Sequence, residues 1–92
     1  MIGARAKITN KSMSSSSTEI SFEIPTAATR FEIKLRSRNA LLQIAFVSGE
    51  SGSNYITIPY GASYAENNIK GGLTIYFQSP TGSQTAEIKH WV

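Results

Sequence analysis

The chain has 92 residues, a size that allows one domain with a single thin core. It has no cysteine, no aspartate and one histidine, His90, which excludes disulfides, thiolate nucleophiles and cysteine-based metal sites and argues against an enzyme. The net charge of +3, from nine basic and six acidic residues, is too small to indicate nucleic-acid binding.

The N-terminal segment, residues 1–17, combines a short strand expected over residues 4–9 with a polar stretch, residues 10–17, that ends in four serines. A serine tract is typical of a flexible loop or arm, so this segment is either a contact arm for a neighbouring subunit or a terminus without a role. The segment lacks the apolar centre of a signal peptide, and no run approaches the roughly 18 apolar residues of a membrane span.

Residues 18–92 form the expected domain, in which apolar and polar residues alternate with the period of two of half-buried strands. Seven further strands are expected, at residues 18–24, 29–37, 41–47, 55–59, 63–66, 73–79 and 85–92. Their core-facing residues are expected to be Ile20, Phe22, Ile24, Phe31, Ile33, Leu35, Leu42, Ile44, Phe46, Ile56, Ile58, Leu73, Ile75, Phe77, Ala86 and Ile88. Seven or eight short strands predict an all-β fold, a small antiparallel β-sandwich or jelly-roll-like barrel.

His90 is the first candidate for catalysis, as a general base oriented by Glu87 or Glu66 and acting on a serine. No G-x-S-x-G motif accompanies it, and strand alternation places it at the rim of the core, so we interpret it as a core-closing residue. Paired carboxylates for glycoside hydrolysis are also not expected, because alternation directs the acidic candidates to solvent. These candidates are Glu19, Glu23 and Glu32. We therefore expect no catalytic residue, no metal site and no cofactor.

A basic stripe is expected on the outer face of the strand that contains Phe31, because its charged residues are spaced two apart. The stripe would be about 27 Å long at roughly 3.4 Å per residue. It consists of Arg30, Lys34, Arg36 and Arg38, interrupted by Glu32. Two interpretations stay open: a solvated strand whose charges deter aggregation, or a docking surface for an acidic protein or for phosphates.

Two aromatic residues, Tyr76 and Trp91, are expected on outer faces of the last two strands. If these strands form a hairpin, the two rings lie diagonal to each other. An exposed pair suits a protein interface or a sugar-stacking platform, whereas a bulge near the C-terminus would instead turn Trp91 into the core.

Residues 54–91, NYITIPYGASYAENNIKGGLTIYFQSPTGSQTAEIKHW, resemble the C-terminal part of small structural proteins of tailed bacteriophages. The resemblance lies in the order of an ITIP strand, a glycine turn followed by Tyr-Xaa-Glu, a TIYFQSPT strand and turn, and AEI before a tryptophan. It implies a non-enzymatic β-sandwich protein of the virion, most simply a decoration or cement protein that binds and stabilises the capsid surface.

Two classes of function follow for the whole chain. The first is a virion protein, made in the host cytoplasm, that contacts the major capsid protein or another virion protein as a homo-oligomer, with a trimer favoured; a neck or tail accessory is a variant of this class. The second is a carbohydrate-binding or adsorption module that recognises a glycan through its aromatic residues. The candidate interface residues are Arg30, Lys34, Arg36, Arg38, Tyr76 and Trp91.

Overall fold

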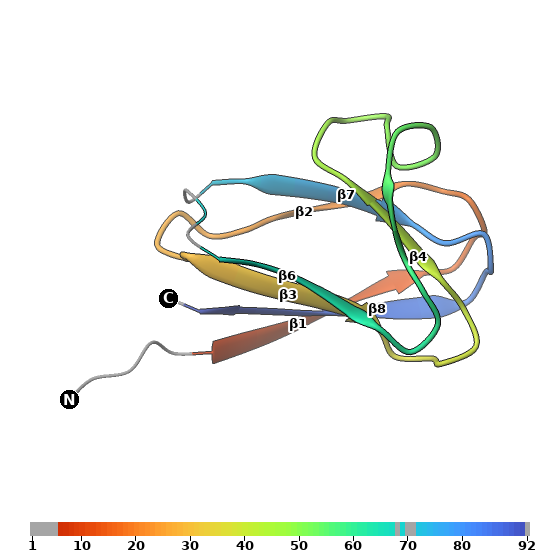
Figure 1. Cartoon of the computed structure of the whole chain (residues 1–92), viewed down its shortest axis with the longest axis horizontal. Helices are drawn as coiled ribbons and strands as arrows, with labels where there is room; N and C mark the ends of the chain where they lie inside the picture. The colour runs from red at the N-terminus through yellow and green to blue at the C-terminus, as the bar shows by residue number, and fades with distance from the viewer. Residues whose placement is uncertain (1–5, 68, 70–71, 92) are drawn as a thin grey trace.

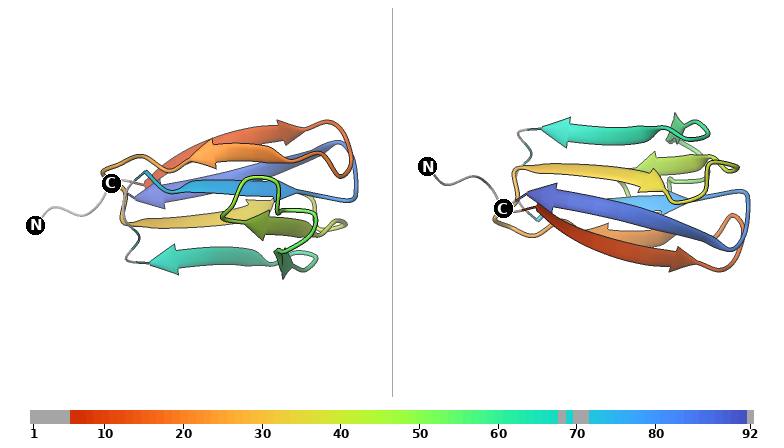
Figure 2. Two further views of the ribbon diagram at one scale, coloured as in Figure 1. Left: turned by 90° about the horizontal axis from the view of Figure 1, so that it is seen from above. Right: turned by 90° about the horizontal axis from the view of Figure 1, so that it is seen from below.

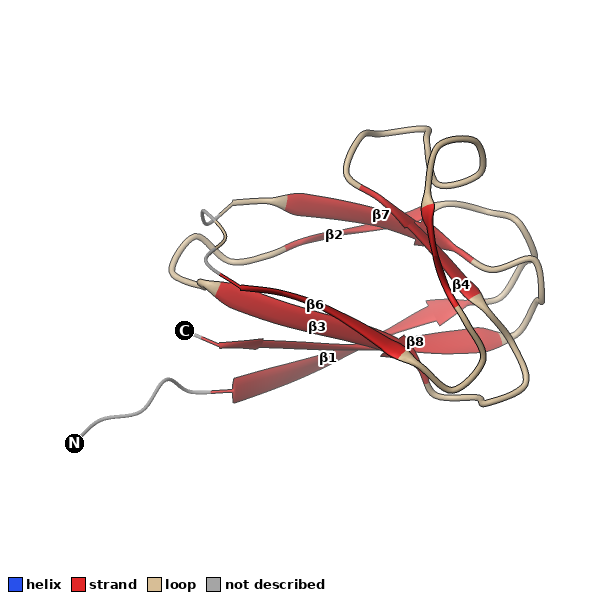
Figure 3. Cartoon of the chain, viewed as in Figure 1, coloured by secondary structure: helices blue, strands red, loops and turns tan. Residues whose placement is uncertain are grey.

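Two four-stranded antiparallel sheets face each other in the computed structural model, which describes residues 6–67, 69 and 72–91 (Figures 1 and 2). The first sheet has the strand order β1-β8-β3-β6 and the second the order β2-β7-β4-β5. The strands are β1 (Ala6–Met13), β2 (Ile20–Glu23), β3 (Arg30–Leu35), β4 (Leu42–Ala45), β5 (Ile56–Ile58), β6 (Ser63–Asn67), β7 (Thr74–Gln78) and β8 (Gln84–Trp91). Strands and loops account for all of the described chain, without a helix (Figure 3).

Most connections cross from one sheet to the other. Of the described strands, only β4 and β5 are both consecutive and paired with each other. This alternation between two sheets is the jelly-roll arrangement, in which the chain winds as a two-stranded ribbon. The predicted all-β sandwich of jelly-roll type is therefore confirmed.

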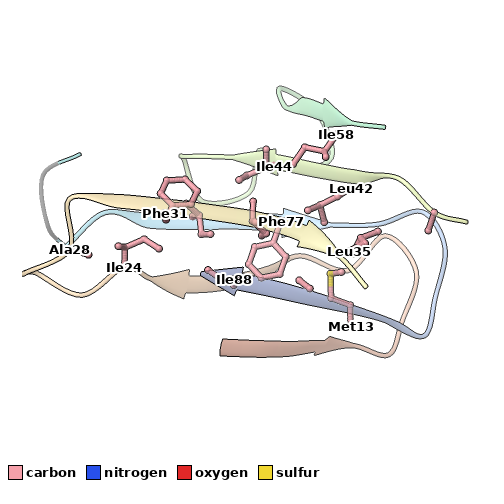
Figure 4. Packing of buried hydrophobic residues seen from close by; sticks show 14 residues of the cluster. Met13, Ile24, Ala28, Phe31, Leu35, Leu42, Ile44, Ile58, Phe77 and Ile88 are labelled. Carbon is pink, nitrogen blue, oxygen red and sulfur yellow. The ribbon is translucent and has the colours of Figure 1, made fainter. Parts of the chain in front are cut away.

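The core lies between the two sheets and consists of the alternating apolar residues (Figure 4). Phe31 and Ile33 of β3 and Ile75 and Phe77 of β7 are completely inaccessible to solvent. Each such side chain stabilises the fold by about 1.5–3 kcal/mol through removal of apolar surface from water. The predicted inward faces of these two strands are confirmed.

The first strand extends further than the sequence indicates. We expected a polar loop to begin at Asn10, but β1 continues to Met13 and pairs with β8 along its whole length. Met13 is 2% exposed, and its burial explains why the strand persists through the polar residues before it. The serines that follow form the β1–β2 connection, whose backbone bonds to Ser79 and Ser83. Residues 1–5 of the expected arm lie outside the described residues.

The last two strands do not form a hairpin, so the condition for a diagonal pair of Tyr76 and Trp91 is not met. β7 belongs to the second sheet and β8 to the first, so Tyr76 and Trp91 lie in different layers. Tyr76 instead faces Ser21 and Ala45 across its two neighbouring strands. The alternation of a strand determines which face a side chain occupies but not which strand is its neighbour.

Candidate functional site

The part of the basic stripe that lies within β3 is on the outer face of the first sheet, as expected. Arg30, Glu32 and Lys34 alternate with the buried residues of β3. Arg36 and Arg38 lie beyond the end of that strand and are exposed. Arg38 lies beside Gly61, in the β5–β6 turn.

Glu87 of β8 neutralises the middle of this stripe. Its carboxylate accepts a hydrogen bond from Nε of Arg36 at 2.9 Å and lies 3.6 Å from Nζ of Lys34. The hydrogen bond from Arg36 and the two neighbouring positive charges hold the pKa of Glu87 below its usual value. Because all three side chains are partly exposed, each pair contributes no more than about 1 kcal/mol to stability.

Two cations converge on the ring of Trp91 at the other end of the stripe. The guanidinium carbon of Arg30 lies 4.2 Å from the ring centroid, and Nζ of Lys89 lies 4.7 Å from it. Both distances are within the range of a cation–π interaction. Trp91 is therefore half-buried by neighbours on the outer face, and the bulge that would have turned it into the core does not occur.

A shallow depression of about 230 Å³ lies on the outer face of the first sheet, and Lys89 is one of its lining residues. Its lining consists of two carboxylates, two ammonium groups and two apolar side chains, one of which, Ile8, is 70% exposed: Ile8, Glu32, Lys34, Glu87, Ile88 and Lys89. Glu32 accepts a hydrogen bond from the hydroxyl of Ser63 at 3.1 Å and does not pair with Lys89, its cross-strand neighbour. The depression thus combines an apolar side chain with charges of both signs.

His90 occupies the core rim, as predicted from alternation. It is 4% exposed, and its ring centroid lies 6.2 Å from that of Phe22. Burial, with a smaller contribution from the charge of Lys7, lowers the pKa of His90. Within the described part of the chain, Nδ1 has no hydrogen-bond partner. Its expected partners are engaged elsewhere, since Glu66 accepts a hydrogen bond from Tyr64 and Glu87 faces the outer side.

A second group of exposed apolar side chains lies outside the candidate interface residues named from the sequence. We call it the β5-edge patch, because its side chains surround the edge strand of the second sheet. Its members are Phe46 (38% exposed), Val47 (55%), Tyr55 (40%), Ile56 (44%) and Tyr60 (66%). Phe46 and Ile56 were expected inside the core and are instead exposed here. Alternation carried no signal for this exposure, because it places Phe46 in phase with the buried Ile44 and Ile56 in phase with the buried Ile58.

The β4–β5 loop, which contains part of the β5-edge patch, is held by Glu19. The carboxylate of Glu19 accepts hydrogen bonds from the backbone N–H groups of Gly49 and Ser51 at 2.8 and 3.1 Å, and from the Ser51 hydroxyl. Partial burial raises the pKa of Glu19, but the three hydrogen bonds from Ser51 and Gly49 outweigh it and hold the pKa below its usual value. The fully buried Ser51 hydroxyl also lies 3.0 Å from Oε1 of Gln78.

The described residues do not contain a group of three or more His, Cys, Asp or Glu side chains that could hold a metal ion. No described helix is long and apolar enough to cross a membrane. The sites that the structure does offer are surfaces: the outer face around Trp91 and the β5-edge patch.

No protein-family model and no curated protein matches the chain. Among solved structures, the chain is similar to the solution NMR structure of a de novo designed double-stranded β-helix, with a TM-score of 0.57 and 13% sequence identity. The match covers 96% of this chain and 99% of the designed one. At this identity the likeness concerns the fold, and it agrees with the jelly-roll strand order described above.

Proposed function

We propose that this protein is a non-catalytic structural subunit that self-associates and becomes part of a bacteriophage virion, as a decoration or cement protein on the capsid surface. The observation that carries the proposal is the β5-edge patch. Five exposed apolar side chains in and beside one edge strand are a candidate protein contact, because exposed apolar surface rimmed by polar residues marks sites of protein interaction.

The edges of the two sheets differ in a way that favours contact at β5. Edge strands offer unpaired backbone N–H and C=O groups, and charged residues usually protect them from pairing with another chain. β1, β2 and β6 each contain at least one Lys or Glu. The edge strand β5, Ile56–Ile58, contains none and is followed by the exposed Tyr60. Because β5 itself contains no charged residue, two copies could pair at this edge without facing like charges on the paired strands.

The resemblance of residues 54–91 to small structural proteins of tailed phages supports the virion as the setting, and so does the jelly-roll fold, which is common among viral capsid proteins. Many copies on a symmetric shell would gain avidity, so each contact can be weak. The partner in this setting would be the major capsid protein or a neighbouring virion protein.

The carbohydrate-binding alternative requires free aromatic faces for stacking. Arg30 and Lys89 already contact the ring of Trp91, and Tyr76 lies in the other sheet. Trp91 and Tyr76 therefore offer no shared stacking surface for a sugar.

Sedimentation velocity of the purified protein over a wide range of concentrations tests the proposal. We expect a closed oligomer. The Ile56→Lys variant should raise the dissociation constant of this oligomer at least tenfold, because the new charge would be buried in the contact. Ser21→Lys is the matched control, since Ser21 is exposed on β2, the opposite edge of the same sheet. A monomer at every concentration, or equal effects of the two variants, would contradict self-association through β5.

A further inference from the structure

Arg30 and Lys89, the two cations on the ring of Trp91, lie on the outer face of the first sheet. They are therefore separate from the β5-edge patch, which belongs to the second sheet. Arg30 comes from β3 and Lys89 from β8, and the register places Arg30 directly opposite Trp91. Three side chains from two strands thus meet at one point. Among the described residues, neither cation has a carboxylate within 4.0 Å.

The two halves of the outer face differ in charge balance. In one half, the carboxylate of Glu87 forms ion pairs with both Lys34 and Arg36. Around Trp91, the neighbouring carboxylate is that of Glu32, which is directed toward Ser63 on β6. Two positive charges that both contact one ring repel each other, and an anion bound beside them would relieve that repulsion.

The surroundings indicate what kind of anion would bind. A carboxylate can accept hydrogen bonds from the guanidinium of Arg30 and from the ammonium of Lys89 at the same time. The exposed Ile8 lies opposite Lys89 on the neighbouring strand and lines the depression of about 230 Å³. An apolar side chain beside a carboxylate would therefore find a complementary contact there. A protein segment supplies both chemistries, whereas inorganic phosphate supplies only the charge.

We infer that the outer face around Arg30, Lys89 and Trp91 is a docking site for an acidic segment of a partner protein, with a Glu or Asp side chain on the two cations and an apolar neighbour over Ile8. The site is separate from the β5 edge, so the result of its test is distinguishable from the result for self-association.

Trp91 is the only tryptophan in the chain, so its fluorescence reports directly on this site. The probe is a capped six-residue peptide of four glutamates around two leucines, added at low ionic strength. We expect a saturable change in the emission of Trp91, and we expect affinity to fall several-fold between about 10 and 150 mM salt, as the screening length shortens from about 30 to 8 Å. The same peptide with glutamines in place of glutamates should give no saturable change.

Variants then separate this site from general attraction to a basic protein. Arg30→Gln and Lys89→Gln should each weaken peptide binding by about tenfold, the usual effect of losing one charge-assisted hydrogen bond. Lys11→Gln is the matched control: it removes the same charge from the same sheet but lies at a position that alternates to the opposite side of β1. Peptide affinity should be unchanged by this control, and thermal unfolding should be similar for all three variants.

Several outcomes would overturn the inference. One is no saturable change in emission with the acidic peptide, and another is equal binding of the glutamine peptide. Equal weakening by Lys11→Gln and Lys89→Gln would show attraction to net charge alone. Tighter binding of an oligosaccharide of glucuronic acid than of the acidic peptide would identify an acidic glycan, and not a protein segment, as the ligand.

Discussion

His90 is surrounded by apolar groups where water would otherwise stabilise its charged form. The ring lies against Phe22, and the charge of Lys7 adds to the cost of protonation. Both influences favour the neutral imidazole in the folded state. In the unfolded chain the same residue titrates near its ordinary pKa of about 6.5.

Stability should therefore fall as the pH decreases from 7.5 to 5.5. On acidification, His90 of the unfolded chain takes up a proton near pH 6.5, whereas His90 of the folded protein stays neutral until the pH reaches its lower pKa. The contribution of His90 to the free energy of unfolding is therefore fully present above pH 6.5 and is lost as the pH falls toward the pKa of the folded state. The slope cannot exceed about 1.4 kcal/mol per pH unit, the limit for one proton. Urea unfolding at the two pH values measures the effect.

His90→Gln should have the same free energy of unfolding at both pH values, because His90 is the only histidine in the chain. Lys7→Gln provides a second variant with an intact core, and it should reduce the pH dependence by removing one unfavourable charge. An undiminished pH dependence in His90→Gln would show that another group is responsible.

At the scale of the elements, the alternation of apolar and polar residues predicts burial correctly within β4 but not beyond its end. The strand ends at Ala45, and Phe46 then lies at the open edge of the sandwich with its ring 6.4 Å from that of Tyr64. The next apolar residues, Val47 and Tyr55, are exposed at the two ends of the loop.

Two phenylalanines that alternation treats alike should therefore respond differently to truncation. Phe77→Ala removes a completely buried ring and should destabilise the protein by about 3–5 kcal/mol. Phe46→Ala removes a ring that is 38% exposed and should cost no more than about 1–2 kcal/mol. Chemical denaturation of both variants gives the comparison, and equal losses would show that Phe46 belongs to the core.

The fold class and most of the core could be predicted from the sequence because alternation directly encodes which side of a strand is buried. The inward faces of β3 and β7 followed from it. The pairing of strands did not, since no local signal distinguishes a β7–β8 hairpin from a crossover between sheets. The proximity of Arg30 to Trp91 was hidden for the same reason, because it depends on the register between β3 and β8.

At the scale of the whole molecule, the two ends of the chain meet in one sheet. β1 pairs with β8, and β8 also pairs with β3, so β8 lies between two strands that precede it in the chain (Figure 1). Such non-local pairing is associated with folding in milliseconds to seconds. The first strand is thus an integral part of the sandwich and cannot leave the sheet without exposing β8.

Deletion of residues 1–13 should therefore destabilise the domain by at least about 3 kcal/mol, because it removes the buried Met13 and the pairing along β8. Circular dichroism and the midpoint of thermal unfolding, compared with the full chain, measure the effect. An unchanged midpoint would indicate that residues 6–13 are dispensable for folding and available as an arm.

The hydrogen bonds of Glu19 also have a consequence for the thermodynamics of association. A loop of this length without tertiary anchors would lose conformational entropy when a partner immobilised it, and that loss would oppose binding. Here the carboxylate of Glu19 has already restricted Gly49 and Ser51 before any partner arrives. The apolar side chains at the base of the loop are thus presented by a preorganised surface, and association through them needs little further ordering.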